Sequence, residues 1–259
     1  MSRFSIITIN LNNFDGLKKT IESVTAQSFK DFEWIVIDGG STDGSRELVE
    51  QYSNHLSYWV SEPDKGVYDA MNKGIEVAHG DYIIFMNSGD CFASQNVLSD
   101  VVDDLDGDIV AGWVKEDNSQ RILKPPACFT LWNLFHNNIP HQAEFIRRGL
   151  FEEIAMYSED LKVIADYEFN IRAALHDYNY KTINRIVAIV EPGGISNTEI
   201  SLMNREEDVI KGRNLPMSIR EDYKYWMEKE KELASTQVLW AVNKRWPLKV
   251  LRVLFKLFG

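Results

Sequence analysis

The first ninety residues alternate between short apolar runs and segments with apolar residues at helical spacing. The runs are rich in β-branched and aromatic residues and end in polar turns, as buried strands do. Strands are predicted over residues 4–9, 33–38, 56–60 and 82–86. Helices are predicted between them, over 14–27, 45–52 and 67–78. Strands that alternate with helices through short turns indicate an α/β fold with a parallel, doubly wound sheet.

After residue 90 the alternation is less regular, and two consecutive prolines at 125 and 126 interrupt it. Further strands are expected over 108–114, 143–146 and 182–190. Further helices are expected over 94–105, 129–135 and 166–175, with a polar helical segment from 199 to 232. No internal repeat or low-complexity tract is present. We therefore expect one domain over 1–232, in which the second half (106–232) packs on the first (1–105).

The last segment, residues 233–259, differs from the rest of the chain in charge. It has no acidic residue, and its basic residues are Lys244, Arg245, Lys249, Arg252 and Lys256. The last four are spaced four, three and four residues apart, so they form one stripe of a helix whose remaining surface is largely apolar. Such a helix is typical of a segment that lies on an anionic membrane leaflet. Docking on the protein body, or on a second subunit of a homodimer, is the alternative.

Composition limits the class of protein. The chain has 259 residues, 44% of them hydrophobic, and a net charge of −11 that argues against a nucleic-acid partner. Cys91 and Cys128 form no CxxC motif, which favours a reducing compartment. The N-terminal residues match no signal peptide, and no run of about 18 apolar residues predicts a transmembrane helix. A cytoplasmic protein is therefore expected.

The strand predicted over 82–86 runs directly into the polar turn Asn87-Ser88-Gly89-Asp90. In open α/β sheets, ligands bind beyond the carboxyl ends of the strands. Carboxylate and amide oxygens suit Mg²⁺ or Mn²⁺, which often takes only one or two carboxylates from the protein and completes its shell with substrate phosphates. Asp90 is therefore a candidate metal ligand. Its alternative role is to cap the helix that follows.

A second carboxylate, Asp38, ends the strand predicted over 33–38 and precedes two glycines. It could accept a hydrogen bond from a nucleotide base or ribose, and Gly39 would let a ligand approach the backbone. The alternative is a turn carboxylate that caps the next helix. The chain has no GxGxxG and no GxxxxGK[ST] motif, which argues against a dehydrogenase and a P-loop protein.

The junction over residues 62–74 is dense in charge. Asp69 and Asn72 lie three residues apart, on one face of the predicted helix, where they could help to hold a nucleotide. Asp64 and Lys65 could contribute to the same site or form a solvated turn. By itself this segment does not decide between the two roles.

Four segments in this order resemble the family 2 glycosyltransferases of the GT-A fold. They are Thr8, residues 38–45, residues 64–74 and residues 87–90, and the similarity is strong over 4–92 and loose beyond. The resemblance implies a Rossmann-type, mostly parallel central sheet with helices on both faces. It also implies that Thr8 and Asp38 hold the nucleotide, and that the turn from Asn87 to Asp90 binds a metal on the pyrophosphate. The residues expected to bind the nucleotide sugar are Thr8, Asn10, Asp38, Gly39, Asp64, Lys65, Asp69, Asn72, Asn87, Ser88 and His141.

One position departs from the family pattern. The usual metal motif begins with an acidic residue, which is Asn87 here, so one ligand charge is missing. We therefore expect dependence on Mn²⁺ or Mg²⁺ with lower affinity, the metal arriving with the sugar nucleotide.

The resemblance further implies a carboxylate general base at the start of a helix in the second half. Asp166 is preferred because an amphipathic helix follows it directly, although Asp also serves as a helix N-cap. Asp160 and Glu168 remain alternatives. His141, which precedes an apolar stretch, resembles a family segment near the donor sugar, although a lone histidine is more often structural. The segment 193–196 is either a loop over the phosphates or a plain turn.

Together with the resemblance, these features predict a metal-assisted transfer of a sugar from a nucleoside diphosphate sugar to a hydroxyl group of a glycan acceptor. That the transfer is inverting is implied by the resemblance alone. The basic tail suggests a lipid-linked acceptor of bacterial surface-polysaccharide synthesis, and a location on the inner face of the plasma membrane. A nucleotidyltransferase is disfavoured, since residues 10–16 carry no Arg. A sugar-nucleotide-binding or membrane-scaffold protein without turnover is the non-enzymatic alternative.

Overall fold

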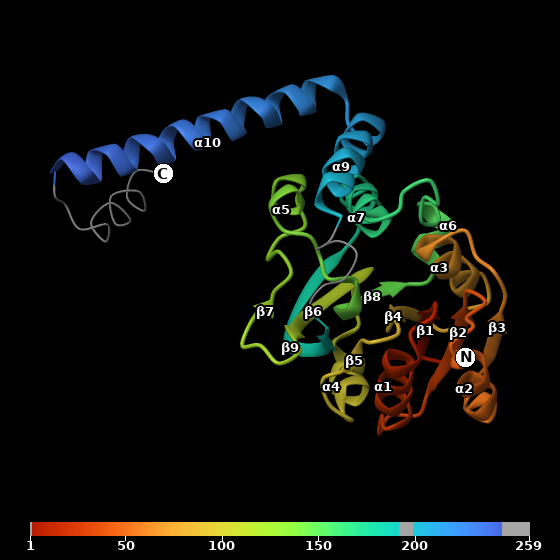
Figure 1. Cartoon of the computed structure of the whole chain (residues 1–259). Helices are drawn as coiled ribbons and strands as arrows, with labels where there is room; N and C mark the ends of the chain where they lie inside the picture. The colour runs from red at the N-terminus through yellow and green to blue at the C-terminus, as the bar shows by residue number, and fades with distance from the viewer. Residues whose placement is uncertain (1, 192–198, 245–259) are drawn as a thin grey trace. The chain divides into compact units, whose positions relative to one another are not determined.

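A computed structural model describes the backbone of residues 2–191 and 199–244. The chain divides into two compact units, Met1–Glu207 and Asp208–Gly259. The first unit contains every residue that we predicted for the site. Nine strands in the described part of this unit form one sheet, in the order β3-β2-β1-β4-β8-β6-β9-β5, with β7 paired to β6 (Figure 1).

The first half of the sheet has the predicted alternation. Its strands are β1 (Phe4–Asn10), β2 (Phe32–Asp38), β3 (Tyr58–Ser61) and β4 (Tyr82–Phe85). All three pairs among them, β1 with β2, β2 with β3 and β1 with β4, are parallel. Asn10 is in register with Asp38, and Asp38 with Ser61. The polar ends of three strands therefore meet at one edge of the sheet.

Helices cover both faces of this half because the strands are apolar on both sides. The helices are α1 (Phe14–Thr25), α2 (Ser45–Gln51) and α3 (Val67–Glu76), and a short 3-10 turn, η1 (Ser53–His55), follows α2. Successive strand residues point to opposite faces. Phe4 and Ile6 join the core cluster that includes Leu17 and Ile21 of α1. On the other face α3 packs so closely on β1 that a Cβ at Gly74 would lie 2.5 Å from Cγ2 of Ile7.

The second half continues the same sheet with strands that run in both directions. Its strands are β5 (Cys91–Phe92), β6 (Ile109–Glu116), β7 (Ile122–Leu123), β8 (Glu144–Arg147) and β9 (Tyr180–Val190). Strand β8 lies between β4 and β6 and is antiparallel to both. Strand β5 pairs antiparallel with β9, and β7 pairs antiparallel with β6. Strands β6 and β9 are parallel. The predicted fold class is confirmed, whereas the antiparallel insertion was not foreseen.

Short helices connect these strands. They are α4 (Val97–Val101), α5 (Leu131–His136), α6 (Gly149–Glu153) and α7 (Ala165–Leu175), with the 3-10 turns η2 (Val102–Asp104) and η3 (His141–Ala143). The continuous helix predicted over 94–105 is therefore a short α-helix followed by a 3-10 turn. The helix predicted over 166–175 is confirmed as α7, which begins one residue earlier, at Ala165.

The polar helical segment predicted over 199–232 consists of two helices, α9 (Ile200–Asn214) and α10 (Met217–Lys244). Pro216 separates them, because the residue before a proline is disfavoured in helical conformation. Within the described residues, no helix is long and apolar enough to span a bilayer. The basic stripe that we predicted from Arg245 to Lys256 lies outside the described residues, as does the segment 193–196.

Candidate functional site

Asp38 is the centre of the edge where β1, β2 and β3 end. Its side chain is fully buried, and its two oxygens accept four hydrogen bonds. The donors are Asn10 Nδ2 at 2.8 Å, Ser41 N at 2.9 Å, Ser41 Oγ at 2.6 Å and Ser61 Oγ at 2.6 Å. Burial alone would raise the pKa of Asp38, but these donors hold it below its ordinary value. Asp38 therefore fixes the three strand ends to one another.

The other residues predicted near the nucleotide lie around this edge. A Cβ at Gly39 would lie 2.4 Å from Oδ2 of Asp64, so glycine lets the Asp64 carboxylate approach the turn closely. Oδ1 of Asp64 accepts from the Gly66 backbone N–H at 2.9 Å. Lys65 is exposed. Thr8, in contrast, is fully buried, and its hydroxyl accepts from Trp34 Nε1 at 3.1 Å.

Two predicted residues on α3 make contacts that hold the backbone. Oδ2 of Asp69 accepts from the backbone N–H of Lys65 at 3.0 Å. Asn72 pairs with Tyr157 at both backbone groups: its amide nitrogen donates to the carbonyl at 2.9 Å, and its oxygen accepts from the N–H at 3.0 Å. Asn72 thereby ties α3 to the segment that precedes α7.

The turn after β4 has a defined geometry. Gly89 has a φ of +104°, in the left-handed region that favours glycine, and Asp90 N donates to Asn87 O at 2.9 Å. Thr20 of α1 holds this turn: its hydroxyl lies 2.7 Å from Asp90 O and 3.1 Å from both Asn87 O and Gly89 N. Thr20 was not predicted from the sequence, because it is one polar residue on the buried side of an otherwise ordinary helix.

Two oxygens of this turn are suited to a cation. Burial raises the pKa of Asp90 to about 6, against the lowering effects of the His141 charge and a hydrogen bond from Gln142. Oδ1 of Asn87 is buried and has no hydrogen-bond partner among the described residues. No group of three or more His, Cys, Asp or Glu side chains is placed to hold a metal within residues 2–191 and 199–234. The protein would therefore contribute only one or two ligands.

A chain of polar contacts joins this turn to α7. Asn87 Nδ2 lies 3.2 Å from His141 Nε2, and His141 Nδ1 lies 3.5 Å from Oδ2 of Asp166. With the amide oriented in this way, Nε2 accepts and Nδ1 carries the proton toward the carboxylate. Burial would lower the pKa of His141, but the hydrogen bond to Asp166 and the charges of Asp166 and Asp90 raise it. The fourth member is Tyr68, whose hydroxyl lies 2.9 Å from Oδ1 of Asp166.

The structure distinguishes among the three carboxylates considered as a general base. Asp166 is 6% exposed and contacts His141 and Tyr68. Glu168 is fully buried, and its carboxylate pairs with Arg172 at 2.9 Å and accepts from Ser158. Asp160 is exposed. The contacts of His141 with Asn87 and with Asp166 thus connect Asp166 to the turn that ends at Asp90.

Glu144 is a carboxylate that the sequence analysis did not select. It lies on β8, is 1% exposed, and burial raises its pKa to about 8, with the Asp166 charge acting in the same direction. Oδ1 of Asn170 and Oε1 of Glu144 have no hydrogen-bond partner among the described residues. The pattern that could have revealed it is a single Glu within the apolar stretch from 143 to 146.

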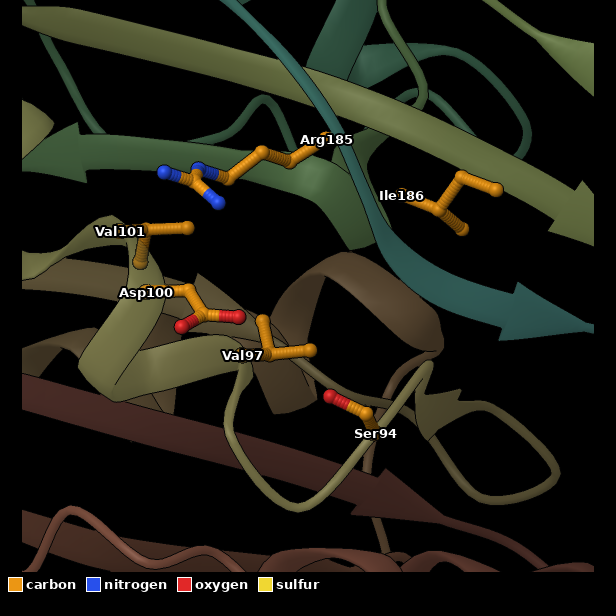
Figure 2. A pocket seen from close by; sticks show the side chains of 6 residues that line it. All are labelled: Ser94, Val97, Asp100, Val101, Arg185 and Ile186. Carbon is orange, nitrogen blue, oxygen red and sulfur yellow. The ribbon is translucent and has the colours of Figure 1, made fainter.

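Figure 2 shows a pocket in another part of the first unit. It is lined by Ser94, Val97, Asp100, Val101, Arg185 and Ile186. None of these residues belongs to the predicted site. The polar edge described above is therefore the better candidate, because it gathers most of the predicted residues.

Comparison with known proteins agrees with this geometry. The model of a family described as glycosyl transferase family 2 matches residues 5–161. An uncharacterized glycosyltransferase of Mycobacterium tuberculosis is 38% identical over 179 residues, which are 66% of this chain and 68% of that protein. A PGL/p-HBAD biosynthesis glycosyltransferase of Mycobacterium bovis is 34% identical over 230 residues, which are 84% of this chain and 85% of that protein.

Solved structures have a similar fold at low sequence identity. TarS of S. aureus (residues 1–349) in complex with UDP-GlcNAc has a TM-score of 0.65 and 21% identity, covering 77% of this chain and 61% of that chain. The mannosyltransferase PcManGT of Pyrobaculum calidifontis in complex with GDP-Man and Mn²⁺ has a TM-score of 0.59 and 16% identity, covering 75% of this chain and 58% of that chain.

Proposed function

The chain belongs to glycosyl transferase family 2, and we propose that it moves a sugar from a nucleoside diphosphate sugar to a hydroxyl group of a glycan acceptor. The donor class is supported by the two structural neighbours that hold UDP-GlcNAc and GDP-Man. The donor would lie along the edge formed by Asn10, Asp38 and Ser61. Its contacts would come from Asp64, Lys65 and the loops around them, since Asp38 itself already accepts four hydrogen bonds.

Asp90 and Asn87 would hold a divalent metal ion, Mn²⁺ or Mg²⁺. The fit is supported by the half-buried Asp90 carboxylate and by Oδ1 of Asn87, which has no hydrogen-bond partner among the described residues, since both are hard oxygen donors. When bound, such an ion would neutralise negative charge on the diphosphate. The donor phosphates would complete its coordination, since no cluster of three metal-ligating side chains is found among the described residues.

Asp166 would act as the general base in a single inverting displacement. Its carboxylate would take the proton from the acceptor hydroxyl as that oxygen forms a bond to the anomeric carbon. The bond from this carbon to the diphosphate breaks at the same time, and its electron pair leaves with the diphosphate oxygen. His141 and Tyr68 would hold the two carboxylate oxygens of Asp166 in place. With its carboxylate held in this orientation, Asp166 would meet the acceptor hydroxyl from one direction only.

The observation that carries this proposal is the chain of contacts from Asn87 through His141 to Asp166. It connects the turn proposed to bind the metal with the residue proposed to take the proton. The test is to incubate the protein with a panel of nucleotide sugars, including UDP-GlcNAc and GDP-mannose, with and without Mn²⁺, under conditions in which water takes the place of the acceptor hydroxyl. Metal-dependent release of the nucleoside diphosphate by the wild type, and its loss in Asp166→Asn but not in Asp160→Asn, would support the proposal.

Other outcomes of the same assay would point to the alternatives. Release of pyrophosphate in a parallel incubation with a nucleoside triphosphate and a sugar 1-phosphate would indicate a nucleotidyltransferase. Binding of a nucleotide sugar, measured as a rise in melting temperature, without any turnover would indicate a binding or scaffold protein. A normal rate in Asp166→Asn would reject the assigned base while leaving the activity in place.

We also propose that the acceptor is lipid-linked and that residues 233–259 bind the inner face of the membrane. The support is the composition of this segment, which has no acidic residue and a four-three-four spacing of basic residues. Sedimentation of the full chain with vesicles of anionic lipid tests this. Replacement of Lys249, Arg252 and Lys256 with Glu should abolish binding, and equal binding to neutral vesicles would contradict it.

A further inference from the structure

The first turn of α7 carries Asp166, but the N-cap side chain makes no hydrogen bond to the start of this helix. The N-cap residue is Ile164, whose side chain cannot accept a hydrogen bond. The first N–H groups of a helix have no partner within the helix. The position of the Asp166 backbone therefore depends on groups from elsewhere in the fold.

Glu206 of α9 supplies an acceptor from more than forty residues further along the chain. Its Oε1 accepts from Lys162 N at 2.6 Å, and its Oε2 accepts from Val163 N at 3.0 Å and from Ile164 N at 3.2 Å. The side chain is 6% exposed, so these bonds are shielded from water. Hydrogen bonds to an ionised carboxylate are shorter and stronger than those between neutral groups. A negative charge is also favourable beside a helix N-terminus.

The same short segment is held from its other side by α3. The hydroxyl of Tyr68 lies 2.8 Å from the carbonyl oxygen of Val163 and 2.9 Å from Oδ1 of Asp166. Val163 thus has its N–H bound by Glu206 and its C=O bound by Tyr68. The Tyr68 hydroxyl has a single proton for two acceptors, the Val163 carbonyl and the Asp166 carboxylate. The position of the Val163 backbone therefore affects the hydrogen bond that Asp166 receives. A shift of this segment would move both the carboxylate and its hydrogen-bond donor.

We propose that Glu206 is a positioning residue for the transfer reaction, which fixes the segment 162–164 and through it the direction of the Asp166 carboxylate. This inference rests on the proposed function of Asp166 as the general base. The proposal gives α9 a role in the reaction, although α9 follows the sheet in sequence and lies outside the edge formed by Asn10, Asp38 and Ser61. Misplacement of a reacting group by about 1 Å can cost on the order of a hundredfold in rate.

The kinetic test compares Glu206→Ala, Glu206→Gln and the wild type in nucleoside diphosphate release from UDP-GlcNAc and GDP-mannose with Mn²⁺. Glu206→Ala should lower kcat by about tenfold to a hundredfold, with KM for the donor changed by less than about twofold. Glu206→Gln should be intermediate, because one oxygen still accepts while the amide nitrogen faces backbone N–H groups. Asp208→Asn is the matched control, since Asp208 is an exposed acidic residue two positions further along α9.

A second measurement separates this inference from the proposed function. Hydrogen exchange followed by mass spectrometry should show faster exchange over residues 162–168 in Glu206→Ala and unchanged exchange there in Asp208→Asn. If the wild type releases no nucleoside diphosphate, the proposed function fails, whereas the exchange experiment still decides whether Glu206 holds the segment. Wild-type exchange in Glu206→Ala would overturn the inference. So would a normal kcat per folded molecule, determined after correction for the unfolded fraction by circular dichroism.

Discussion

The hydroxyl of Tyr68 lies 2.9 Å from Oδ1 of Asp166, although the two residues are 98 positions apart in the chain. Tyr68 lies on α3, in the half of the protein that carries the edge formed by Asn10, Asp38 and Ser61, and Asp166 lies on α7 in the other half. Both side chains are buried, and burial followed by the Asp166 charge raises the pKa of Tyr68 well above its ordinary value. The phenol therefore stays protonated and donates to the carboxylate throughout the physiological pH range.

Replacement of Tyr68 with Phe removes this donor while keeping the ring. We expect kcat to fall by about tenfold with little change in the KM for the donor, because the carboxylate loses one fixed orientation. Stability should fall by about 1 kcal/mol, since the carbonyl of Val163 also loses its partner. Steady-state kinetics and urea unfolding measure the two effects. Tyr58→Phe, at a residue that is 41% exposed, is the control, and equal effects at both positions would contradict the assignment.

The two carboxylates Asp166 and Glu168 should respond differently to conversion to the amide. Asp166→Asn should lower kcat by about a hundredfold to ten-thousandfold and leave the fold intact, as expected for loss of a general base. Glu168→Gln should instead destabilise the protein by about 3 kcal/mol, because it breaks the ion pair between the fully buried Glu168 and the half-buried Arg172. Melting temperature and kcat, measured on both variants, give this comparison. A folded Glu168→Gln variant with no activity would transfer the assignment to Glu168.

Restoring the acidic residue at position 87 should strengthen metal binding. Asn87→Asp adds a second carboxylate to a turn that already holds Asp90, so we expect Mn²⁺ to bind about tenfold more tightly in the presence of a nucleoside diphosphate. Without metal, the variant should be less stable than the wild type because two like charges are close together. Calorimetric titration and melting curves with and without Mn²⁺ measure both effects. Asn54→Asp, at an exposed position outside the site, serves as the control. A melting temperature of Asn87→Asp that Mn²⁺ leaves unchanged would argue against a metal at this turn.

Glu144 should make stability depend on pH. Burial raises its pKa from 4.5 to about 8, so between these values the folded protein holds a proton that the unfolded chain has released. The free energy of unfolding should therefore fall as the pH rises through this window, by about 1 kcal/mol per pH unit from this group. Glu144→Gln, which resembles the protonated acid, should lack this component and become the more stable protein near pH 8.

Urea unfolding of the wild type and Glu144→Gln at intervals from pH 5 to pH 8 isolates the effect as the difference between the two curves. Glu22→Gln, at an exposed position, should follow the wild-type curve. Parallel curves for the wild type and Glu144→Gln would show that Glu144 is already ionised in the folded state.

The sequence by itself predicted the family, the first half of the sheet and the residues at its carboxyl edge. This was possible because those features are local. Strands β1, β2 and β4 are buried on both faces and appear as apolar runs, and each ends in a polar turn such as the one from Asn87 to Asp90. Parallel pairing then places the strand ends together whatever the rest of the chain does. Asp38 and Asn10 could be assigned to one edge on this basis alone.

Tertiary structure alone decided the features that depend on distant contacts. The antiparallel insertion of β8 between β4 and β6 has no signature in hydrophobic periodicity, because a buried strand has the same pattern in either direction. That insertion brings His141 between Asn87 and Asp166, and it buries Glu144 in the sheet. The hydrogen bond from Val163 N–H to Glu206, just before α7, likewise joins residues more than forty positions apart. Charge and spacing show which residues could take part in chemistry, whereas burial and neighbours, which only the folded chain supplies, determine which of them do.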